Sequence, residues 1–68
     1  MSLVEAARFL SPFEASLAKS VLDAEQIPAI LFDINSAHTP GLAWVEVRLM
    51  VHEDDLIRAR RLIAEARA

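Results

Sequence analysis

The side chains best suited to chemistry are two histidines and a run of acids, and their spacing argues against a catalytic or metal site. His38 and His52 stand apart in a chain that has no cysteine. Three acids, Glu53–Asp55, follow His52, but consecutive side chains point in different directions and rarely converge on one ion. A helix start explains the same run, because carboxylates are stabilised at the positive end of the helix dipole. We therefore expect no catalytic residue, no metal ion and no cofactor.

One strand carries a more informative pattern. Trp44–Val51 alternates between an apolar set and a mixed set, and the mixed set contains Trp44, Arg48 and Met50. Tryptophan, methionine and arginine are enriched at protein interfaces. On the preceding strand Ile30, Phe32 and Ile34 share one parity and Asp33 has the other, and the sequence leaves open which parity shares the mixed face. The candidate interface and ligand residues are Trp44, Arg48, Met50, Phe32 and Asp33.

Charge and hydropathy argue against two other classes of partner. The net charge is −3, and no aromatic residue lies among the arginines of Arg58–Arg61. We therefore expect no nucleic-acid partner. The longest apolar run, Ile27–Phe32, contains Pro28 and is too short to cross a bilayer, and Met1–Leu10 lacks the basic start of a signal peptide. We expect no membrane partner and a cytoplasmic location.

The elements that must position these residues follow from local signals. Leu3–Leu10 is apolar with two charges and is predicted as a strand. Ser11 and Glu14 form a predicted capping box, with Pro12 at the first helical position. The helix that starts there ends near Gln26 and has a broader apolar arc than a surface helix needs. The remaining predicted elements are a strand at Ala29–Ile34, a loop at Asn35–Gly41, a strand at Trp44–Val51 and a helix opened by Glu53–Asp55.

This order, β-α-β-β-α, predicts an α+β domain of ferredoxin-like topology. The crossover from the first strand to the second should be right-handed and make these strands parallel. The third strand then fits between them, antiparallel to both. We predict one domain over residues 1–68, with a three-stranded sheet of order 1-3-2 and both helices on one face.

The size of the chain points to association. Of its 68 residues, 54% are hydrophobic, whereas a domain of about 60 residues buries only about 60% of its unfolded surface. Neither a disulfide nor a metal site is expected to supplement so small a core. The sheet face opposite the helices has no cover from its own chain. We therefore expect self-association, or docking on another protein, through that face.

Several segments together carry a resemblance to a known family. They are Ser11–Ala15 at the first helix start, Leu22–Ala29 at its end, Val47–Val51 in the third strand and Asp55–Ala59 in the second helix. With these segments, which span nearly the whole chain, the protein resembles the small bacterial domains called prokaryotic signal-transducing proteins. The resemblance implies a ferredoxin-like, PII-related fold and a role in signal transduction, and it brings no established catalytic residue.

The chain departs from the family at Gln26, where the family usually has the glycine that ends a helix in the left-handed conformation. Gln26 therefore requires either a different turn or a strained residue.

Three classes of function are consistent with these features. We favour a regulatory or protein-interaction module that acts as a homodimer or docked on a partner, with a small-molecule ligand left open. The alternatives are a small dimeric enzyme with a site between sheets, drawing on His38, His52, Asp33 or Arg48, and a purely structural accessory subunit.

Overall fold

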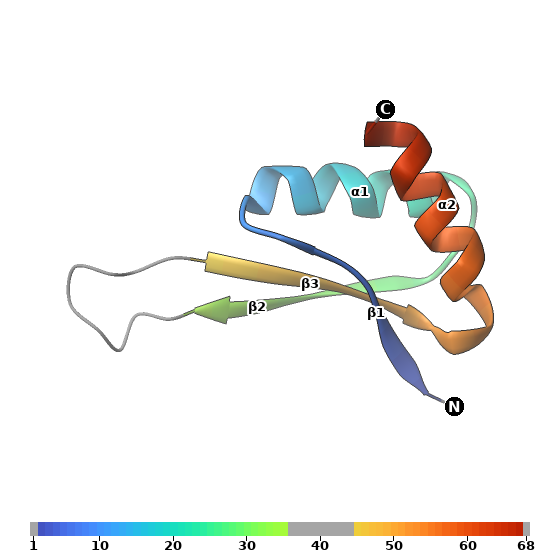
Figure 1. The fold of residues 1–68 in the computed structure, drawn as a ribbon, viewed down its shortest axis with the longest axis horizontal. Coiled ribbons are helices and arrows are strands. Elements are labelled where there is room, and N and C mark those ends of the chain that lie inside the picture. Colours follow the sequence, from blue (N-terminus) through green and yellow to red (C-terminus); the bar gives the residue numbers. More distant parts are fainter. Residues whose placement is uncertain (1, 36–44, 68) are drawn as a thin grey trace.

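The computed structural model describes residues 2–35 and 45–67, with the backbone alone at residues 33–35 and 45. The elements are β1 (Leu3–Phe9), α1 (Pro12–Ala24), β2 (Ala29–Asn35), β3 (Val45–His52), a 3-10 turn η1 (Glu53–Asp55) and α2 (Leu56–Arg67). The sheet has the order β1-β3-β2, and both of its strand pairs are antiparallel. Both helices cover the same face of the sheet (Figure 1). The predicted α+β fold, with strand order 1-3-2, is confirmed.

The start of α1 contains half of the predicted capping box. Ser11 is the extended N-cap residue (φ −113°, ψ 121°), and its Oγ accepts a hydrogen bond from the backbone N–H of Glu14 at 3.3 Å. The reciprocal bond was predicted wrongly, since among the described residues the Glu14 carboxylate makes no hydrogen bond to the Ser11 N–H. Glu14 is exposed, so water can solvate its carboxylate instead at little net cost.

At the end of α1 the sequence left two alternatives open, a different turn or a strained residue at Gln26. The structure has the strained residue. Gln26 has a positive φ of 61°. Its N–H bonds to the Asp23 carbonyl at 3.0 Å, and the Ile27 N–H bonds to the Leu22 carbonyl at 2.9 Å. These two bonds define a Schellman motif, and its accompanying apolar contact joins Leu22 and Ile27 in the core. The turn directs the chain from α1 into β2.

β1 carries a bulge that the sequence did not predict. The pairing with β3 shifts between Glu5 and Ala7, so that Glu5 opposes Met50 and Ala7 opposes Leu49. Ala6 is the extra residue and is buried. A bulge changes the parity of a strand, and for this reason Glu5 and Arg8 occupy the same face although an odd number of positions separates them.

The core lies between the sheet and the helices. Its largest fully buried side chains are Leu22, Ile27, Val47, Leu49 and Val51. The helices contribute three small buried residues, Ala15, Ala18 and Ala59. The alternation predicted for β3 is confirmed at Val47, Leu49 and Val51, so the neighbouring positions of β3 face away from the helices.

Candidate interaction surface

The sheet face turned away from the helices, called here the open sheet face, is built by alternate positions of all three strands. The register aligns Arg8, Arg48 and Phe32 in one row and Glu5, Met50 and Ile30 in the next. Leu3 and Glu46 continue the same face along β1 and β3. Among the described side chains, the open sheet face therefore comprises Leu3, Glu5, Arg8, Ile30, Phe32, Glu46, Arg48, Met50 and His52.

Apolar side chains are only partly covered on this face. Leu3 is 46% exposed, Ile30 45% and Phe32 48%. Ile30 and Phe32 lie two residues apart on β2, and Met50 pairs with Ile30 across the ladder. Two-residue spacing on one strand places side chains on a common side. Part of the face is therefore an apolar strip that burial against another surface would stabilise.

The rest of the open sheet face is a network of ion pairs. Arg8 Nη2 lies 3.0 Å from Glu5 Oε1, and Arg8 Nη1 lies 2.7 Å from Glu46 Oε1. The hydrogen bond to Glu5 and the charge of Glu46 raise the pKa of Arg8 above its ordinary value. Exposed pairs of this kind stabilise a monomer little, but they fix where positive and negative charge stand on the face.

Arg48 connects the two parts of the open sheet face. Its Nε is 3.4 Å from Glu5 Oε1, but this nitrogen is buried without a hydrogen-bond acceptor among the described residues. The distance fits an ion pair, but the contact does not meet the geometry of a hydrogen bond. Its side chain as a whole is 42% exposed. Arg48 therefore presents charge at the surface beside Phe32 and is imperfectly paired among the described residues.

The candidate residues from the sequence are placed as follows. The structure brings Phe32, Arg48 and Met50 together on the open sheet face, and it decides that Ile30 and Phe32, rather than the opposite parity, share this face. The Asp33 backbone pairs with Val47, and its side chain lies outside the described part. Trp44 also lies outside the described residues. The sequence did not single out Leu3, since its position on this face depends on the register with His52.

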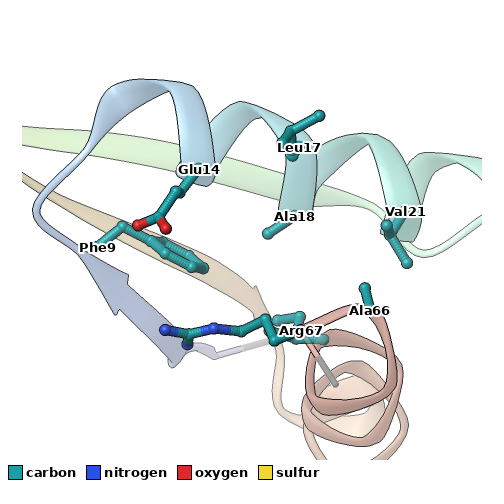
Figure 2. Close-up of a pocket in the computed structure, with 8 residues that line it drawn as sticks. Phe9, Glu14, Leu17, Ala18, Val21, Ala66 and Arg67 are labelled. Carbon is teal, nitrogen blue, oxygen red and sulfur yellow. The ribbon is translucent and has the colours of Figure 1, made fainter.

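A groove in the helix layer was also missed. It lies between α1 and the C-terminal end of α2, is lined by residues from both helices and β1, and encloses about 430 Å³ (Figure 2). The signal for it was the broad apolar arc of α1, which contains Leu17 and Val21. Periodicity alone did not show that α2 leaves part of this arc uncovered.

Two residues of the enzymatic alternative, Arg48 and His52, lie on the same face of β3. His52 Nδ1 lies 3.8 Å from Asp54 Oδ2, while Arg48 lies against Glu5. His38 is outside the described residues. In the described part of the chain, no three His, Asp or Glu side chains gather to hold a metal ion. Neither helix described here has the length and apolar character needed to cross a membrane.

Comparison with known proteins identifies a family for this chain. A family model described as "putative prokaryotic signal transducing protein" matches residues 3–67. The resemblance indicated by the helix start, the helix end and the third strand is confirmed. No curated protein and no solved structure matches the chain. The matched region runs from β1 to the end of α2 and contains the whole open sheet face.

Proposed function

Because the chain belongs to the family described as putative prokaryotic signal transducing protein, we propose that it is a regulatory interaction module. In this proposal it works as a homodimer, and two copies pair through the open sheet face. One observation carries the proposal: this face combines half-exposed apolar side chains with a balanced set of charges.

The apolar strip supplies the driving force. Ile30 and Phe32 each keep nearly half of their surface in water, beside Met50 in the same ladder. Burying apolar area stabilises a complex by about 25 cal/mol per Å² before the entropy costs of association are counted. A flat sheet face meets another sheet face readily, since side chains from two such faces can interdigitate.

The charges favour a second copy as the occupant. The described part of the open sheet face carries two arginines, Arg8 and Arg48, and two glutamates, Glu5 and Glu46, so their formal charges cancel in a chain of net charge −3. In a two-fold dimer each residue meets its symmetry-related surface. A neutral face can do so without net repulsion.

Sedimentation equilibrium of the wild-type chain and of Phe32→Glu tests the proposal. We expect the wild type to be dimeric. The glutamate removes an apolar anchor and places a charge in the interface, so the dimer dissociation constant should rise at least about thirtyfold, which corresponds to a hot-spot loss of about 2 kcal/mol.

Ile57→Glu is the matched control. Ile57 is 85% exposed on α2, in the layer on the other side of the sheet, so the same substitution there should leave the dimer intact. A wild-type chain that stays monomeric at high concentration contradicts the proposal, as does a dimer that Ile57→Glu dissociates and Phe32→Glu does not.

A further inference from the structure

The inter-helix groove has an aliphatic end. Val21 of α1 points toward Ala66 of α2 across the groove (Figure 2), and Leu17, one turn earlier on α1, also lines it. Leu17 is 53% exposed, so about half of its side chain is open to solvent at this end of the groove. The enclosed volume of about 430 Å³ falls within the range of about 300–1,000 Å³ found for small-molecule sites.

The other end of the groove is polar and surrounds the ring of Phe9. Figure 2 shows the Glu14 carboxylate reaching from α1 toward Phe9, and the Arg67 guanidinium coming from α2 on the other side of the ring. The guanidinium carbon of Arg67 lies 5.4 Å from the ring centroid. This cation–π contact holds the guanidinium at the rim of the groove.

Both charged groups are available to a ligand. The Glu14 carboxylate does not close the capping box that its spacing from Ser11 predicts. Among the described residues neither Glu14 nor Arg67 takes part in an ion pair. The groove thus presents one carboxylate and one guanidinium at the Phe9 end and aliphatic side chains at the other.

We propose that the inter-helix groove binds a free α-amino acid with an aliphatic side chain. The ammonium group of the ligand pairs with Glu14, its carboxylate pairs with Arg67, and its side chain lies against Leu17, Val21 and Ala66. Charge-assisted hydrogen bonds to both groups select the zwitterion. The groove is in the helix layer, on the opposite side of the sheet from the open sheet face, so this site does not depend on the proposed dimer.

Titration of the full chain with L-leucine, followed by two-dimensional NMR, tests the proposal. We expect saturable shifts at Leu17, Val21 and Ala66 with a dissociation constant of about 1 mM or below. Three analogues each lack one feature: isocaproate has no amine, isoamylamine has no carboxylate, and glycine has no side chain. Each should bind about tenfold more weakly, because one charged or apolar contact is lost.

Two variants link each ligand group to its residue. Glu14→Gln should weaken leucine binding about tenfold and leave isocaproate binding unchanged. Arg67→Gln should weaken leucine binding about tenfold and leave isoamylamine binding unchanged. Glu65→Gln and Arg61→Gln make the same replacements at exposed positions of α2 outside the groove and should bind leucine as the wild type does.

Three outcomes overturn the proposal. Leucine could produce no saturable shift at the groove residues, or isocaproate could bind as tightly as leucine, which would assign the groove to ligands that carry a carboxylate alone. Leucine could also bind both groove variants as tightly as the wild type. The association state of Glu14→Gln and Arg67→Gln should match that of the wild type, so failure of this site is distinguishable from failure of the dimer.

Discussion

At the scale of single residues, the backbone conformation of Gln26 is the clearest source of steric strain in the fold. A residue with a Cβ in the left-handed region crowds the following carbonyl, at about 1–2 kcal/mol. Gln26 accepts this cost at φ 61° because its N–H and that of Ile27 then satisfy two carbonyls at the end of α1. Glycine would allow the same bonds without the steric cost, although it loses more backbone entropy on folding.

We predict that Gln26→Gly stabilises the protein by about 1 kcal/mol, because relief of the left-handed strain exceeds the added entropy of the unfolded chain. Urea unfolding at one fixed protein concentration measures the change, since association would otherwise shift the apparent stability. Gln26→Ala keeps a Cβ and should stay within about 0.5 kcal/mol of the wild type. Equal stabilisation by glycine and alanine would show that φ at this position is not the cause.

Features of single residues were predictable from the sequence where one local conformation has a much lower free energy than its alternatives. Ser11 as the cap and the need for strain or a different turn at Gln26 follow from local backbone chemistry. The direction of the Glu14 carboxylate does not, because a capping bond and solvation at the groove rim differ little in free energy. The spacing from Ser11 therefore predicts a capping bond for Glu14, and its position at the groove follows only from the tertiary structure.

At the scale of elements, small residues on the helices set how closely the two layers pack. Ala15 and Ala59 have no exposed surface, and Ala18 is 7% exposed. They stand where α1 and α2 meet the sheet and each other. Larger side chains there would force the layers apart, because a close-packed interior has no space to receive added methyl groups.

We predict that Ala59→Leu destabilises the protein by about 1–3 kcal/mol through overpacking. Thermal or urea unfolding gives the value. Ala64→Leu makes the same change at an exposed position of α2 and should change stability by less than about 0.5 kcal/mol. Similar effects at both positions would indicate that helix propensity, and not packing against the sheet, controls the response.

The elements themselves were predictable and the bulge in β1 was not. The signals for α1 and β3 are a capping sequence and a regular two-residue alternation, and both are local. The bulge at Ala6 has no glycine to mark it. It arises because Val4 and Phe9 must both pack on the helix side, which an unbroken alternation forbids for residues five positions apart. That requirement comes from the β1–β3 register, which local sequence does not contain.

At the scale of the whole molecule, the two proposals concern opposite sides of the sheet, one covered by the helices and one uncovered. The helices cover one side of the sheet (Figure 1), and the inter-helix groove lies between them. The open sheet face carries its charges in balance, while the chain as a whole is acidic. The apolar surplus in the composition predicted that some surface would remain uncovered. The register of β1 against β3 brings Glu5 and Arg8 together on the open sheet face. The balance of charges on that face depends on this register.

If charge balance permits self-association, changing that balance should prevent it, and the opposite change in a second chain should restore it. We predict that Arg48→Glu and Glu5→Arg each weaken the homodimer by at least about tenfold, because like charges then face each other across the two-fold axis. Mixed in equal amounts, the two variants should form a heterodimer that native mass spectrometry resolves by mass.

Raising the salt concentration should partly restore each homodimer, because screening reduces the repulsion between exposed charges. A mixture that stays monomeric, or variants that dimerise like the wild type, would place the self-association of this protein elsewhere than on the open sheet face.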